Sequence, residues 1–126
     1  MSFDWNTYKD LAEELRHKED EASKRTAVSR LYYSVFHIAK KFLIDIEEYN
    51  YSEYKEPHAQ VWSEFISKGK TYKSIGENGK RLRNYRNDAD YKDDLLRLDE
   101  IVETSFRIAN NVLVYLQQIQ PNNEKK

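Results

Sequence analysis

The chain contains no cysteine, which excludes disulfide bonds, thiol nucleophiles and cysteine-based zinc sites. It has only three glycines and two prolines in 126 residues, too few for the many tight turns of a β-sandwich or β-barrel. No apolar run approaches the roughly 20 residues that cross a membrane, and residues 1–6 lack the pattern of a signal peptide. These absences predict a cytoplasmic helical protein with no membrane association.

Charge is nearly balanced but unevenly placed. The formal net charge of −1 argues against a protein that is basic over its whole surface. Residues 68–86 are nevertheless strongly basic, with Glu77 as their only acid, whereas the charged residues of 87–103 are mostly acidic. One interpretation is a solvated helix surface whose arginines pair with the acids of 88–103. The other is a strip that contacts phosphate groups in an otherwise acidic protein.

Apolar residues recur every three or four positions over most of the chain, which is typical of amphipathic helices. Asp4 is expected to cap the first helix, and Pro57 suits the first turn of a short third helix. The glycines at 69, 76 and 79 suggest a looser connection. The other helices are expected over about 4–17, 20–49, 80–87 and 92–120.

Long helices joined by short connections favour an antiparallel bundle. The expected fold is therefore all-α: an antiparallel four-helix bundle with an additional short helix. Residues 1–120 are expected to form one domain, and 121–126 a disordered polar tail. The last helix carries two adjacent apolar stripes, which suggests contact with more than one neighbour.

Residues 27–39 carry polar side chains inside a strongly apolar helix. Arg30, Tyr33 and His37 follow one another at intervals of three and four, so they share a face beside Ser29. This pattern suits either a functional surface or a helix whose polar groups are hydrogen-bonded to a neighbour.

Residues 81–91 form the second unusual segment. Arg83, Asn87 and Asp90 fall on one helical face, and Arg86 reaches Asp90 one turn later. A structural ion pair worth a few tenths of a kcal/mol would have the same spacing.

The three histidines, at 17, 37 and 58, are not spaced as a helical metal pair, and the Glu-x-x-His pattern of di-iron bundles is absent. We therefore expect neither a metal nor another cofactor.

Together the two segments resemble the HEPN family, in particular its small stand-alone prokaryotic members. The resemblance rests on Ser-Arg-x-Tyr-Tyr-x-x-Phe-His at 29–37 and Arg-x-x-Arg-Asn-x-Ala-Asp-Tyr at 83–91, and it extends over nearly the whole chain. It implies a helical bundle that dimerises and acts on or binds RNA, in many members as a metal-independent ribonuclease of a toxin or defence system. The family signature is an Arg, a polar neighbour and a His a few residues on. Arg86 and Asn87 match it, but Tyr91 stands where the His is expected.

This departure matters because metal-free RNA cleavage needs a base for the 2′-hydroxyl proton and an acid for the leaving 5′-oxygen. A tyrosine with a pKa of about 10 is a poor base at neutral pH, although it can donate a proton or a hydrogen bond. His37 or His58 could supply the imidazole from another helix or from a partner subunit. The residues so implicated are Arg86, Asn87 and Tyr91 as catalytic, Lys80, Arg81 and Arg83 as phosphate-binding, and Asp90, Arg30, Tyr33, His37 and His58 as supporting.

Two functions follow. The first is a homodimeric RNA-binding protein with metal-independent endoribonuclease activity, in a toxin–antitoxin or antiviral system. The alternative is a non-catalytic helical dimer that binds a nucleotide or a partner protein such as a nucleotidyltransferase-like antitoxin. A histidine that shares a phosphate with Arg86 would favour the enzyme, whereas Tyr91 and Asp90 alone would favour the binding module.

Overall fold

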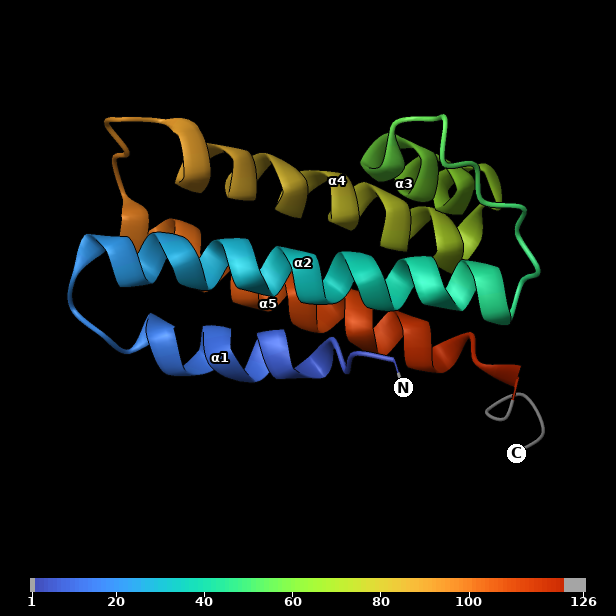
Figure 1. Cartoon of the computed structure of the whole chain (residues 1–126), viewed down its shortest axis with the longest axis horizontal. Helices are drawn as coiled ribbons and strands as arrows, with labels where there is room; N and C mark the ends of the chain where they lie inside the picture. Colours follow the sequence, from blue (N-terminus) through green and yellow to red (C-terminus); the bar gives the residue numbers. More distant parts are fainter. Residues whose placement is uncertain (1, 122–126) are drawn as a thin grey trace.

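The computed structural model describes residues 2–121, and these form five α-helices (Figure 1). The all-α class predicted from the sequence is confirmed. The expected polar tail falls, apart from Pro121, outside the described residues. The helices are α1 (Asn6–Arg16), α2 (Glu21–Asp45), α3 (Pro57–Ser67), α4 (Lys70–Tyr91) and α5 (Leu98–Gln118).

The long helix α2 lies at the centre of the bundle and packs against α1, α4 and α5 (Figure 1). Successive long helices run in opposite directions, whereas α2 and α5 run the same way side by side. The short helix α3 packs mainly on α4. In the described part of the chain, no helix is both long and apolar enough to cross a membrane.

Short polar signals set the starts of α2 and α3. Asp20 precedes α2 and its carboxylate accepts a hydrogen bond from the amide of Ser23 at 2.9 Å. Glu56 plays the same part for α3, and Pro57 occupies the first turn as expected. The prediction for α1 was one residue early, because Trp5 rather than Asp4 is the N-cap. Asp4 still binds the backbone amide of Asn6, at 3.0 Å.

The predicted loose connection over 69–79 is wrong, because α4 begins at Lys70 and runs through both later glycines. These glycines allow close packing of α3 on α4. A Cβ on Gly79 would lie 2.3 Å from the Trp62 ring, and one on Gly76 would lie 2.6 Å from the Trp62 carbonyl oxygen. Of the three glycines, only Gly69 has a positive φ, 73°, and it precedes the first turn of α4.

Two predicted helix ends were also wrong. Helix α2 stops at Asp45 rather than Tyr49, and α5 starts at Leu98 rather than 92. The segment between α4 and α5 is held by Arg25 of α2, whose guanidinium donates hydrogen bonds to the carbonyl oxygens of Ala89, Lys92 and Asp93. This connection fixes the C-terminal end of α4, which carries most of the residues singled out in the sequence.

Candidate functional site

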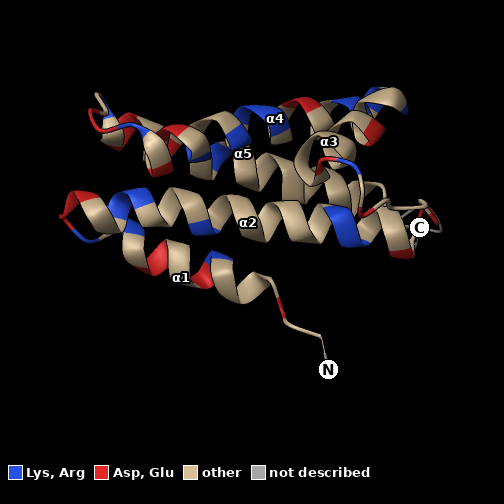
Figure 2. Ribbon diagram, turned by 45° about the horizontal axis from the view of Figure 1, so that its top comes forward, with Lys and Arg blue, Asp and Glu red and all other residues tan. Residues whose placement is uncertain are grey.

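The two unusual segments of the sequence meet where the middle of α2 faces the second half of α4, close to the start of α3. Basic residues recur along α4 in this region (Figure 2). We call this cluster the Arg86 site. It consists of Ser29, Arg30, Tyr32 and Tyr33 of α2, Glu56 and His58 at the start of α3, and Arg83, Arg86 and Asp90 of α4.

Arg86 is a buried cation whose charge and hydrogen-bond donors are only partly compensated by its neighbours. It is only 5% exposed, and its Nη1 lies 3.7 Å from the Asp90 carboxylate, too far for a strong hydrogen bond. Its Nε has no hydrogen-bond partner among the described residues. The guanidinium carbon lies 5.2 Å from the ring centroids of both Tyr32 and Tyr33. Aromatic faces attract the cation but do not satisfy its N–H donors.

Asp90 connects Arg86 to α2. The spacing of Arg86 and Asp90 predicted this ion pair, and the structure contains it. The Ser29 hydroxyl donates to the Asp90 carboxylate at 3.2 Å and accepts from Arg30 at 3.3 Å. The Asp90 carboxylate is thus shared between a buried cation and a neighbouring helix, which leaves part of the Arg86 charge unneutralised.

Arg83, one turn before Arg86, has a similar environment. Its Nη2 lies 3.4 Å from the Glu56 carboxylate, and its buried Nε has no partner in the described part of the chain. Burial acts to raise the pKa of Glu56, but hydrogen bonds from the amides of Ala59 and His58 and the charge of Arg83 lower it overall. Glu56 is therefore ionised at neutral pH and holds Arg83 toward the start of α3.

His58 lies at the same place, joined to the core by two hydrogen bonds. Trp62 Nε1 donates to the Tyr32 hydroxyl at 3.0 Å, and that hydroxyl is 2.7 Å from His58 Nδ1. An indole N–H can only donate, so the Tyr32 oxygen accepts from Trp62 and its own proton is free for His58. This assigns the proton of the neutral imidazole to Nε2, which becomes a hydrogen-bond donor.

The charge state of His58 follows from its surroundings. Burial, together with the nearby charges of Arg83 and Arg86, lowers the pKa of His58 below its usual value. Burial also raises the pKa of the Tyr32 hydroxyl, which stays protonated. At neutral pH, His58 is therefore an uncharged ring near two cations, and it can donate a hydrogen bond to an anion that they hold.

His37 lies one turn after Tyr33 on α2, and its environment differs from that of His58. Its ring is stacked on Trp5, with centroids 3.6 Å apart and planes 9° apart. Burial, with a contribution from Lys40, lowers its pKa to about 4.

Arg30 contacts two aromatic rings. Its guanidinium carbon lies 5.1 Å from the ring centroid of Tyr8 and 5.2 Å from that of Tyr33.

No hydrogen bond or ion pair joins the remaining site residues named from the sequence to Arg86 in the described part of the chain. Tyr91 is 75% exposed at the last position of α4. Asn87 is half-buried and Lys80 exposed, both on the Arg83 side of α4. Arg81 is also exposed but is turned about 160° from Arg83 around the helix, at about 100° per residue. The structure thus brings together Arg83, Arg86 and Asp90 but not Arg81.

Tyr32 and Glu56 were missed as members of the site. Tyr32 reads as a core residue, since it lies in an apolar stretch and is fully buried. Glu56 directly precedes Pro57, a pattern that indicates a helix start and gives no hint of an arginine partner.

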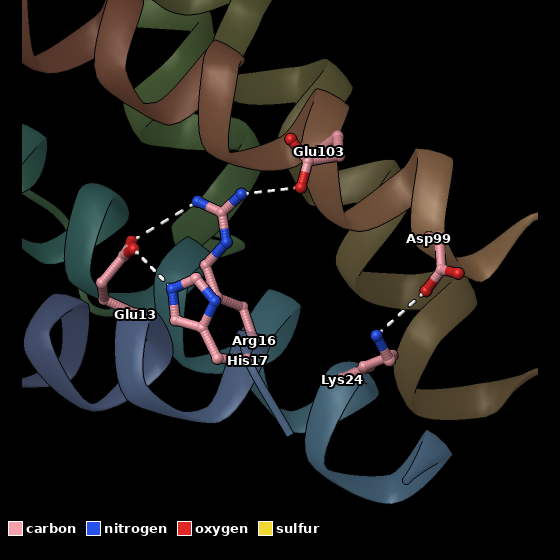
Figure 3. A network of polar contacts seen from close by, with 6 residues as sticks. All are labelled: Glu13, Arg16, His17, Lys24, Asp99 and Glu103. Atoms are coloured by element: carbon pink, nitrogen blue, oxygen red, sulfur yellow. Dashed lines mark hydrogen bonds and ion pairs between the residues drawn. The ribbon is translucent and has the colours of Figure 1, made fainter. Parts of the chain in front are cut away.

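The arginines of α4 are not neutralised by the acidic stretch that follows them. Among the described residues, Asp90 is the only acid of 88–103 that forms an ion pair with 68–86, through Arg86. Asp99 pairs with Lys24 at 3.1 Å and Glu103 with Arg16 at 2.7 Å, both on the side of α1 and α2 (Figure 3). The interpretation of the basic strip as mere pairing with 88–103 is therefore wrong.

The chemistry available to the site is that of anion recognition. Two guanidinium groups have unused donors, a neutral imidazole adds another, and aromatic rings flank them. A guanidinium fork fits two oxygens of a phosphate group. In the described part of the chain, no three His, Cys, Asp or Glu side chains are grouped as metal ligands would be.

Comparison with known proteins gives one match. A model of the HEPN domain family matches residues 8–119. No curated protein and no solved structure was found to match the chain. The matched span runs from the first turn of α1 to the end of α5 and includes every residue of the Arg86 site. Since it covers most of the sequence, the chain belongs to the HEPN domain family.

Proposed function

We propose that this protein binds RNA through the phosphates of its backbone, with Arg83 and Arg86 as the main contacts. Domains of this family are generally associated with ribonuclease activity or nucleotide binding. The single observation that supports the proposal best is the buried Arg86 guanidinium with an unpartnered Nε. A buried donor without a partner costs about 1–3 kcal/mol, and together with the long 3.7 Å contact to Asp90 it leaves the Arg86 cation incompletely compensated, which favours an anion beside it.

RNA cleavage is a second candidate, and the position of His58 favours it. In metal-free cleavage the 2′-oxygen bonds to phosphorus and gives its proton to a base, while the 5′-oxygen leaves and receives a proton. Arg86 can stabilise the additional negative charge on phosphorus. The hydrogen bond from Tyr32 makes His58 Nε2 a donor, which suits contact with the leaving oxygen or with the phosphate rather than removal of the 2′ proton. Because the neutral His58 ring can donate a hydrogen bond but does not give up its proton, cleavage requires both a base for the 2′ proton and an acid for the leaving 5′-oxygen in addition to the Arg86 site, and a partner subunit is one source.

We place this activity in a homodimer that acts in a toxin–antitoxin or antiviral system, with a nucleotidyltransferase-like antitoxin as a candidate partner. The support is the family membership and the grouping of Arg83, Arg86 and His58 where α2, α3 and α4 meet. The non-catalytic alternative differs in one measurable respect. A nucleotide-binding or protein-docking module would bind a mononucleotide or its partner as tightly as it binds an RNA strand, or more tightly.

The experiment is equilibrium binding and incubation of purified protein with a single-stranded RNA in EDTA. We expect salt-sensitive binding by the wild type. Arg86→Lys keeps the charge but loses the two-pronged grip, so its affinity should fall about tenfold or more, while its thermal melt stays close to that of the wild type. Absence of RNA binding at low salt would overturn the proposal.

Cleavage of the RNA is measured in the same incubations. If RNA is cut in EDTA by the wild type and less by His58→Gln, the second candidate is supported. If RNA is bound but left intact under all conditions, the protein acts by binding alone.

A further inference from the structure

A stripe of basic and aromatic side chains continues from the Arg86 site along α2. Arg30, Tyr33, His37 and Lys41 follow one another every three or four residues, so they lie on one face of the helix. At 1.5 Å per residue this stripe is about 16 Å long. It lies on α2, which runs between α1 and α4 (Figure 1). The Arg86 site is thus one part of a longer surface that suits a chain-like ligand.

Beyond Tyr33, the stripe reaches the stacked rings of Trp5 and His37. Tyr33 and His37 have their centroids 6.5 Å apart, and Trp5 lies on His37 at 3.6 Å. Trp5 is also held edge to face by Phe3 at 4.7 Å and by Tyr8 at 5.3 Å. Three ring contacts fix the orientation of the indole, although Trp5 precedes the first turn of α1. A rigid, half-buried indole loses little conformational entropy when another ring stacks on it.

Two adjoining hollows border the Trp5 ring. One has a volume of about 500 Å³ and the other about 270 Å³, and Phe3, Trp5, Lys41 and Asp45 line both. The larger volume is within the range of small-molecule sites, roughly 300–1,000 Å³. In the described residues neither Lys41 nor Asp45 forms an ion pair, so the lining of both hollows includes an unpaired ammonium donor and an unpaired carboxylate acceptor. An aromatic ring that carries polar edges fits such a place.

We propose that these hollows form a base-binding subsite, in which a nucleobase of the RNA held at Arg86 stacks on Trp5. This inference rests on the proposed function. Continuity supports it, because Tyr33 and His37 join the subsite to the phosphate site without a break. Every base has an aromatic face, and proteins that hold single strands combine stacking rings with a basic track. Bases in a duplex are already stacked on each other, so the ligand is single-stranded RNA.

The test is a fluorescence-anisotropy titration of a short oligouridine, with a strand of the same length that lacks bases as the control ligand. Trp5→Ala should weaken binding of the normal strand about 5- to 150-fold, the range for the loss of one stacked base. Trp5→Phe, which keeps an aromatic face, should retain most of the affinity. The base-free strand should bind wild type and Trp5→Ala alike, since its phosphates still reach Arg83 and Arg86.

A second measurement needs no variant, in case Trp5→Ala fails to fold. The only other tryptophan, Trp62, is fully buried, so acrylamide should quench mainly Trp5. Oligouridine should protect Trp5 from acrylamide, whereas the base-free strand should not. If the wild type binds RNA and Trp5→Ala binds it equally well, or if Trp5 is not protected, the subsite is refuted while the phosphate site stands. If no strand binds the wild type, both proposals fall.

Discussion

Replacement of Arg86 by methionine should leave the fold as stable as the wild type or more stable, which is unusual for a residue that is 5% exposed. The unpartnered Nε costs about 1–3 kcal/mol, and the contacts with Tyr32 and Tyr33 offset this by about 0.5–2 kcal/mol each. The 3.7 Å pair with Asp90 adds little, because the Asp90 side chain is 26% exposed and water can solvate it. These contributions nearly cancel. We therefore expect the free energy of unfolding of Arg86→Met to lie within about 1 kcal/mol of the wild type or above it.

Arg25→Met is the matched control. Arg25 is also largely buried, with a side chain 17% exposed, but its donors are used. It binds Glu21 at 2.8 Å and the carbonyl oxygens of Ala89, Lys92 and Asp93 at 2.6–3.2 Å. A hydrogen bond to a charged group contributes about 1.5–3 kcal/mol, less where water can replace it. We expect this variant to lose about 2–4 kcal/mol.

Urea unfolding followed by circular dichroism measures both variants. We expect the free energy of unfolding to be kept in Arg86→Met and lowered in Arg25→Met, although both replace a largely buried arginine of the same bundle. A loss of about 3–5 kcal/mol in Arg86→Met is the value for truncating a structural buried ion pair. That result would show that Arg86 is kept for stability, and it would refute the argument that its burial serves anion binding.

Three further predictions test other parts of the structure. Gly79→Ala should destabilise the protein by about 1–3 kcal/mol in urea unfolding, because its Cβ would lie 2.3 Å from the Trp62 ring. Within a helix this change usually stabilises, and a stabilised variant would mean that the close contact is absent. The lowered pKa of His37 means that its contribution to stability is present above about pH 6.5 and is lost as the pH falls toward about 4. His37→Phe should keep the stack and remove this pH dependence. As the pH falls, the free energy of unfolding of His37→Phe should rise relative to that of the wild type by at most about 3 kcal/mol, and by less because the ring is partly solvated. Unfolding free energies of the two proteins that change in parallel with pH would contradict the assignment. Sedimentation equilibrium at micromolar concentration should give twice the 15.2 kDa of the chain, and a value near 15.2 kDa would refute the homodimer.

The helices could be predicted wherever a local signal marks them. Pro57 indicated the start of α3, and the apolar period indicated α2, although not the residue at which it ends. The same local reasoning failed at Gly76 and Gly79, because a glycine in an isolated sequence resembles a break. Its actual role, to let α3 approach α4, depends on Trp62, a residue of another helix.

The same holds for the site: a contact within one helix could be predicted, whereas a contact between helices could not. The spacing of Arg86 and Asp90 was sufficient to predict their contact, since both lie on one helix. The sequence offered His37 and His58 equally, and it could not show that His58 is the one near Arg83 and Arg86, because this depends on how α3 packs on α4 and on the contact between His58 and the Tyr32 hydroxyl. The family motif assigns Tyr91 to the site by its position in the sequence, and this assignment stays a prediction. Tyr91 is mostly exposed at the end of α4, and the imidazole near the arginines comes from α3.

The most direct test of the central claim, that Arg86 holds an RNA phosphate, is the salt dependence of binding to single-stranded RNA. Wild type, Arg86→Met and Arg81→Met would be titrated over a range of salt concentrations. Each phosphate contact contributes about 0.7 to the slope of log K against log salt, so Arg86→Met should lose about that much along with affinity. Arg81, on the other side of α4, should leave the slope unchanged when replaced. An Arg86→Met protein with the slope and affinity of the wild type would contradict the account.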